Sequence, residues 1–559
     1  MIVYSHRPFT LNIPSFLRDL LTRLERAPAS LDRDAILELL IDFGEAYSAA
    51  ADALLPEEDD DVTTLRGWAD AAHALAQALV AAWHHDWDGA RAAIASCREF
   101  VASLRATSTI GDVSAKAAEG FAFYGLYPEQ YILAAEQAVS DRPGRTLTCI
   151  GVRSIGAPLA HVVGAAAERL GTRGEVITVR PRGHPFDRRL HVSDRLRRRL
   201  VERRDGWFGV VDEGPGLSGS SFAAVSDALM NLGIPEDAIV LFPSWCPPRD
   251  ALRSDRGRRA VERHAKAIGR FEDVVHTDGM IDLSGGNWRA RVIGADEHHW
   301  PAVHPQHERR KYLTADGTRI MRFAGLGRYG RKARQRAQTL AAAGFAAAPL
   351  DLRHGFLTLA WIDGEPAARE RIATRAADYL TFLRRTFATT ERARTDDIVE
   401  MMKVNIEEGV GGDAAAAIEP LAHDARRFDE PAVAIDARMQ QHEWIASAGA
   451  VLKMDGLDHH ADDFFPGCRD IAWDIAGAAV ELNLDEAAAR TLAARYADGT
   501  RDRTIPLRMP FYEAAYLAYR LGYVTLAAES LAGSADGERF TRLRTRCRRS
   551  LEVLAARRR

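Results

Sequence analysis

The most constraining feature of this 559-residue chain is a strand, turn and helix pattern over residues 209–232. An apolar run ends in two adjacent acids, Asp212 and Glu213, and a loop of glycine, serine and proline follows. The amphipathic residues 222–232 then predict a helix. The first turn of a helix presents unpaired backbone N–H groups and the positive end of a dipole. The loop is therefore a candidate phosphate cradle, and the acids lie within reach of sugar hydroxyls beside it.

Two further strand and loop units precede this pattern. Residues 147–152 predict a buried strand, followed by a short loop and a helix over residues 158–170. Residues 176–179 predict another strand that leads into a basic stretch. Strands that alternate with helices indicate a parallel sheet covered on both faces. Such sheets bind ligands at the carboxyl ends of their strands, where all three loops are expected to lie.

Taken in this order, the three units resemble the type I phosphoribosyltransferases. The resemblance implies a doubly wound parallel-sheet (α/β) domain over residues 114–250 that binds the sugar diphosphate PRPP together with magnesium. It implies that Asp212 and Glu213 are the catalytic acids that meet the ribose hydroxyls. It also implies a set of PRPP-binding residues: Arg153, Ser154, Gly156, Arg180, Arg182, Ser218, Gly219, Ser220 and Ser221.

The C-terminal half begins with a different pattern. Residues 318–323 predict a strand that carries Arg322, and residues 331–343 predict a helix. The glycines between them formally match the dinucleotide-binding fingerprint G-x-G-x-x-G. Residues 355–366, however, predict an antiparallel hairpin rather than the crossover strand that this fingerprint requires. The pattern therefore favours a small antiparallel lobe over a dinucleotide-binding fold.

This half resembles the aminoglycoside and choline kinase-like phosphotransferases, which have a protein-kinase-like fold. The resemblance implies a bilobal α+β domain over residues 305–559, with Arg322 at the position of the lysine that binds the ATP phosphates. It implies that Asp436 is catalytic and that Gln441 and Asp455 bind a metal. Residues 361–364 would form the hinge between the lobes, and residues 466–477 would support the site. The chain departs from the family pattern where arginine replaces lysine and glutamine replaces asparagine.

The remaining segments carry no recognisable chemistry. Residues 1–113 predict helices over 14–24, 32–54, 62–85 and 88–104, which would cap the sheet or form a homodimer. Residues 251–304 predict a connector or a lid. The expected architecture is therefore a helical region, a parallel-sheet domain, a connector and a bilobal domain.

Composition narrows the functional class. Hydrophobic residues make up 47% of the chain and charged residues 27%, which is typical of a globular protein. The net charge of −4 indicates no nucleic-acid partner. Five scattered cysteines favour a reducing cytoplasm over a disulfide framework, and they form no zinc-binding pair. No apolar run is long enough to predict a membrane span.

The sequence therefore predicts an enzyme that transfers phosphoribose from PRPP to a nitrogen base or amine, with magnesium. Its C-terminal half would use ATP to phosphorylate, or would bind, a related nucleoside or nucleotide. Two alternatives remain. The protein is either a non-catalytic sensor of PRPP or a nucleotide, or an ATP-dependent small-molecule kinase with an inactive transferase domain.

Overall fold

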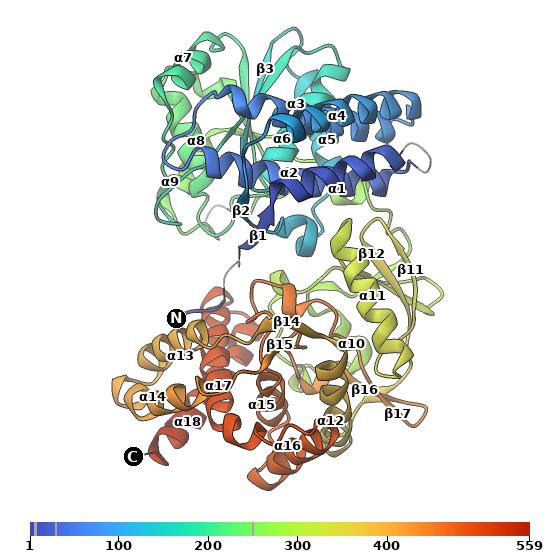
Figure 1. Cartoon of the computed structure of the whole chain (residues 1–559), viewed down its shortest axis with the longest axis vertical. Coiled ribbons are helices and arrows are strands. Elements are labelled where there is room, and N and C mark those ends of the chain that lie inside the picture. The colour runs from blue at the N-terminus through green and yellow to red at the C-terminus, as the bar shows by residue number, and fades with distance from the viewer. Residues whose placement is uncertain (5–7, 28–30, 249–250, 559) are drawn as a thin grey trace.

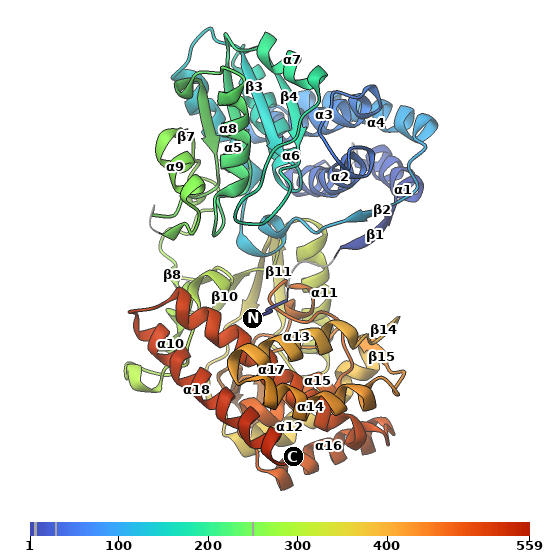
Figure 2. The same cartoon turned by 90° about the vertical axis from the view of Figure 1, so that its left-hand side faces the viewer.

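A computed structural model describes residues 1–4, 8–27, 31–248 and 251–558 of the chain. Two halves are stacked along the long axis of the molecule, with the N-terminal half above the C-terminal half in Figure 1. The N-terminal half combines helices with a parallel sheet, and the C-terminal half combines antiparallel sheets with a bundle of helices. Figure 2 shows the same two halves after a turn of 90° about the vertical axis.

The N-terminal region is helical, as its apolar spacing predicts. A short antiparallel pair, β1 (Phe9–Asn12) with β2 (Asp112–Ala115), brackets the region. Side chains of Asn12, Asp32 and Asp86 cap three of the helices by accepting a backbone N–H of the first turn. The helices are α1 (Ile13–Arg26), α2 (Arg33–Leu54), α3 (Arg66–Trp83) and α4 (Trp87–Thr107).

The predicted parallel sheet is confirmed. Its five strands run in the order β4-β3-β5-β6-β7, and every pair is parallel. Alternate strand residues face two separate apolar cores, one with α6 and the N-terminal helices and one with α7 and α8. Helices therefore cover both faces. The elements are α5 (Pro128–Ser140), β3 (Leu147–Val152), α6 (Gly156–Arg169), β4 (Gly174–Val179), α7 (Asp194–Glu202), β5 (Trp207–Val211), α8 (Ser220–Asn231), β6 (Ile239–Phe242), α9 (Asp255–Arg263) and β7 (Ala265–Lys266).

The C-terminal half starts with a five-stranded antiparallel sheet in the order β11-β12-β10-β9-β8. Helix α11 packs against it. The predicted hairpin is formed by β11 and β12, a few residues earlier in the chain than expected. The two strands are joined by a turn at His354, whose φ is +49°. The elements are β8 (Ile281–Asp282), α10 (Trp288–Val292), β9 (Lys311–Leu313), β10 (Arg319–Phe323), α11 (Arg328–Ala342), β11 (Pro349–Arg353) and β12 (Phe356–Ala360).

Helices dominate the rest of the C-terminal half. The short hairpin of β16 and β17 pairs with β13, and β14 pairs with β15. The elements are β13 (Glu365–Pro366), α12 (Arg369–Thr386), β14 (Ala388–Arg392), α13 (Asp396–Gly409), α14 (Gly412–Ala425), β15 (Pro431–Val433), β16 (Trp444–Ser447), β17 (Ala450–Lys453), α15 (Ala472–Glu481), α16 (Glu486–Thr500), α17 (Ile505–Ser530) and α18 (Ala535–Ala556).

The two halves are joined by shared packing and by ion pairs. Tyr127 and Phe271 pack against Phe323 and Phe356, with ring centroids 5.6–6.4 Å apart. Acids of α2 bind the first turn of α11, where Arg328 pairs with Asp42 and Glu45. The segment predicted as a connector supplies the edge strands β7 and β8, one in each large sheet. The N-terminal helices therefore support both halves.

Among the residues that the structure describes, no helix combines the length and the apolar character needed to cross a membrane.

Candidate functional site

The two acids predicted to be catalytic lie together at the carboxyl end of β5. Asp212 and Glu213 line a cavity of about 1100 Å³ between the halves, which we name the interface cavity. The hydroxyl of Tyr131 donates to the Asp212 carbonyl at 2.7 Å and fixes the backbone there. Burial raises the pKa of the Asp212 carboxyl to about 6. Burial also raises the pKa of Glu213 to about 8, and the nearby acids Glu119 and Asp212 add to this shift.

The glycine and serine loop after these acids has the predicted form. Gly219 has a φ of +66°, and α8 begins at the next residue. The hydroxyls of Ser218 and Ser220 donate to the carbonyl oxygen of Pro185, at 2.9 and 2.6 Å. Ser221 accepts a hydrogen bond from the Arg188 guanidinium at 2.7 Å. The segment around Pro185 therefore binds two of the serines that a phosphate would need.

The loop between β3 and α6 approaches β5 closely. A Cβ atom at Gly156 would lie only 2.4 Å from the Val211 carbonyl oxygen, so only glycine fits there. Ser154 has a φ of +119°, a strained conformation for a residue other than glycine. Strained backbone of this kind is often found at functional sites. The carbonyl oxygen of Ser154 accepts a hydrogen bond from the hydroxyl of Ser48 in α2.

The three arginines predicted to bind PRPP lie outside the interface cavity. Arg153 pairs with Asp52 of α2 at 2.8 Å, and Arg180 pairs with the same carboxylate at 2.5 Å. Arg153 also pairs with Asp59. Arg182 binds Asp59 and the backbone of residues 55–56. None of the three lines the interface cavity. The arginines that do line it are Arg188, Arg253 and Arg310.

A second cavity of about 470 Å³ lies in the C-terminal half, and we name it the apolar slot. Its walls come from β10 and β12 on one side and the β16–β17 hairpin on the other. The predicted hinge, residues 361–364, forms one edge without regular secondary structure. The apolar wall residues include Ile320, Leu340, Ala347, Leu359 and Ile445. The inner end is charged and contains Arg322, Arg438, Glu443, Lys453 and Asp455.

Arg322 and Asp455, which the resemblance assigns to phosphate and metal binding, lie side by side at the inner end of the slot. The Arg322 guanidinium is 2.9 Å from the Asp455 carboxylate and 2.7 Å from that of Asp458. Arg309 extends this network through Asp458, at 3.0 Å. Burial would raise the pKa of Asp458, but the two guanidinium groups hold it well below its usual value. Burial would also raise the pKa of the Asp455 carboxyl, but Arg322 holds it well below its usual value.

Asp436 does not reach the slot. Its side chain is fully buried and is bound by the Tyr379 hydroxyl at 2.6 Å and the Lys453 ammonium at 3.1 Å. Asp474 holds the backbone around it by accepting the N–H groups of Asp436 and Ala437, which is the support predicted for residues 466–477. Two residues further on, Arg438 is the side chain of this loop that lines the slot.

Gln441 is also turned away from the site. Its side-chain oxygen accepts a hydrogen bond from Arg369 at 3.0 Å, and it does not line the slot. Glu443 lines the apolar slot instead, and its carboxylate lies 2.8 Å from the Lys453 ammonium. The sequence motifs did not identify Glu443, Arg438 or Lys453 as site residues. Their positions offered a signal, because Glu443 directly precedes the apolar strand β16 and Lys453 is the last residue of β17.

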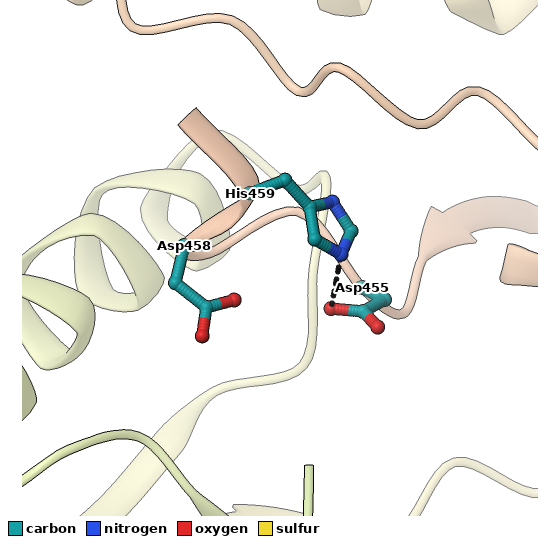
Figure 3. A group of neighbouring side chains, drawn as sticks. All are labelled: Asp455, Asp458 and His459. Atoms are coloured by element: carbon teal, nitrogen blue, oxygen red, sulfur yellow. Dashed lines mark ion pairs between the residues drawn. The ribbon is translucent and has the colours of Figure 1, made fainter. Parts of the chain in front are cut away.

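Asp455, Asp458 and His459 form a group that could hold a metal ion, with ligand atoms within 4.8 Å of one another. Figure 3 shows His459 and Asp455 turned toward each other, 3.7 Å apart. Asp458 pairs with two arginines, whereas Asp455 pairs with one, Arg322, at 2.9 Å. Carboxylate oxygen suits magnesium. Asp455, the member that lines the slot, therefore fits a magnesium ion best.

No protein-family model matches the chain, and no curated protein matches its sequence. Solved structures match in part. A choline/ethanolamine kinase family protein from Mesorhizobium loti is 14% identical, with a TM-score of 0.34, over 44% of this chain and 88% of that one. Choline kinase LicA from Streptococcus pneumoniae is 14% identical, with a TM-score of 0.31, over 44% and 90%. The gentamicin complex of APH(2″)-IIa is 11% identical, with a TM-score of 0.32, over 50% and 93%.

Proposed function

We propose that the apolar slot binds ATP and that the C-terminal half transfers the terminal phosphoryl group to a hydroxyl of a small molecule. One observation carries this proposal: a cavity with apolar walls ends in a buried arginine beside a carboxylate. A planar base is stabilised between apolar walls, and polyphosphate needs cations. Phosphoryl transfer depends mostly on positioning and on charge neutralisation, which such a site supplies.

Each end of the slot then has a distinct task. The base would lie between Ile320 and Leu359 on one wall and Ile445 on the other. Arg322 would bind the phosphates, and Asp455 would hold the magnesium ion that neutralises them. Asp436 supports this arrangement by anchoring Lys453 and is not the proton acceptor, because its carboxylate is enclosed.

Replacing Arg322 by methionine should weaken ATP binding by about 10-fold or more, because a charged hydrogen bond to phosphate is lost. Isothermal titration calorimetry with ATP and magnesium measures this directly, and thermal melting checks the fold of the variant. Arg319→Met is the matched control, since Arg319 is exposed on the same strand and should leave affinity unchanged. Equal affinity in Arg322→Met would contradict the phosphate placement, and no binding by the wild type would contradict the proposed function.

The interface cavity supports a second candidate function, which is the binding of PRPP. The specific observation is that Asp212, Glu213 and Ser221 line one cavity with Arg188. Calorimetry with PRPP and magnesium should show binding that is lost when Asp212→Asn and Glu213→Gln are combined. Release of pyrophosphate in the presence of nitrogen acceptors would favour a transferase. Binding without such release would favour a sensor.

A further inference from the structure

The two cavities share a wall. Glu308 lines both the apolar slot and the interface cavity. Its carboxylate is fixed there, because it accepts hydrogen bonds from the Gly286 backbone N–H and from the indole N–H of Trp288, each at 3.1 Å. Glu308 therefore faces both cavities.

A second line of contacts connects the sites. Phe123 lines the interface cavity, and the Arg309 guanidinium lies over its ring, 4.7 Å from the centroid. Arg309 in turn pairs with Asp458, which pairs with Arg322. The charge of Asp463 also raises the pKa of Glu213 across the boundary between the halves. A chain of side-chain contacts therefore links the two charged regions.

The walls of the interface cavity indicate the chemistry of its ligand. The parallel-sheet half contributes the neighbouring carboxyls Asp212 and Glu213, which suit a pair of vicinal hydroxyls. It also contributes Arg188 and Ser221, which suit a phosphate. Trp245, 42% exposed, adds an aromatic wall. These groups together match a phosphorylated sugar with a ring substituent.

We propose that the interface cavity is the acceptor site of the phosphotransferase, so that the two halves form one composite active site. The acceptor is a sugar phosphate, with its phosphate at Arg188 and Ser221 and its vicinal hydroxyls at Asp212 and Glu213. A further hydroxyl of the sugar lies at Glu308. This inference rests on the proposed binding of ATP in the apolar slot.

The reaction is a single displacement at phosphorus. The acceptor oxygen forms a bond to the γ-phosphorus of ATP while the bond between that phosphorus and the β,γ-bridging oxygen breaks. ADP leaves with the electron pair of the broken bond. The proton of the acceptor hydroxyl passes to the carboxylate of Glu308, which makes Glu308 the catalytic base of this step.

The first test separates the two cavities in the full-length protein. Ribose 5-phosphate should bind the wild type and should stimulate the release of ADP from ATP. The double variant Asp212→Asn/Glu213→Gln and the variant Arg188→Met should each bind ribose 5-phosphate at least 10-fold more weakly. Both should bind ATP as the wild type does, because the apolar slot is intact. Arg189→Met is the matched control, since that exposed side chain lies outside the cavity.

The second test addresses the base. Glu308→Gln should bind ATP and ribose 5-phosphate normally, because glutamine still accepts the hydrogen bond of Trp288, while stimulated ADP release falls about 100-fold. Normal ADP release in Glu308→Gln would overturn its assignment as the base. If ATP binds but ribose 5-phosphate, glucose 6-phosphate and PRPP all fail to bind, the composite site is overturned and the ATP proposal stands. If ATP itself fails to bind, the proposed function is what fails.

Discussion

Replacing Asp455 by asparagine should reduce ATP turnover by about 100-fold or more. The carboxylate lines the inner end of the apolar slot, which Asp458 and His459 do not, so it is the side chain of this group best placed for magnesium. Asparagine keeps the size of the side chain but removes the charge that the ion requires. A coupled assay of ADP release across magnesium concentrations measures the effect, which more magnesium should only partly restore.

Asp363→Asn is the control for this change. Asp363 lines the hinge edge of the same slot and is exposed there, far along the chain from the charged residues. Its side chain accepts a hydrogen bond from the Trp361 indole, which asparagine can also do. Turnover should therefore stay within about twofold of the wild type, the variation expected of a surface change. Undiminished turnover in Asp455→Asn would remove this residue from the site.

The largest effect on stability is expected at Arg508, near the start of α17. Its side chain is 1% exposed and pairs with Asp470 at 2.7 Å, Asp502 at 2.6 Å and Glu430 at 3.2 Å. Methionine would keep the packing volume and leave the buried Asp470 without its cation. Removing one partner of a buried ion pair costs about 3–5 kcal/mol. The free energy of unfolding in urea should fall by that amount, while Arg503→Met, an exposed neighbour, should change little.

The loss should depend on pH. Burial raises the pKa of Asp470 in the wild type, and removal of the guanidinium raises it further. A carboxyl whose pKa is higher in the folded state binds its proton more readily there, so acid favours folding of the variant. The gap in unfolding free energy between variant and wild type should therefore narrow from about pH 8 to about pH 5. A gap that widens in acid would show that Asp470 is not the group left uncompensated.

Local patterns predicted much of the fold. The parallel strands were visible because a strand buried on both faces is apolar throughout, as in β5. Arg322 and Asp455, which the resemblance assigned to one site, lie 2.9 Å apart, and each lies in a strand or shortly after one. Asp212 and Glu213 were likewise expected to lie beside the serine loop, and both line one cavity with it.

Long-range pairing and loop register could not be predicted. Asp52 and Asp59 lie about 100 residues before the arginines they neutralise, and nothing local to Arg153 or Arg180 indicates such partners. In the loop after β15, a shift of two residues decides whether Asp436 or Arg438 faces the slot. Chain spacing alone does not resolve that shift, because the backbone is held by a distant side chain, Asp474.

The aromatic packing between the halves has a consequence for how this protein can be divided. Tyr127, Phe271, Phe323 and Phe356 belong to a single buried cluster that also contains the helices of the N-terminal region. A cut near residue 305 would pass through that cluster and expose apolar surface on both fragments. Each half produced alone is therefore expected to be less stable than it is in the full-length chain, because each would lose part of the shared core.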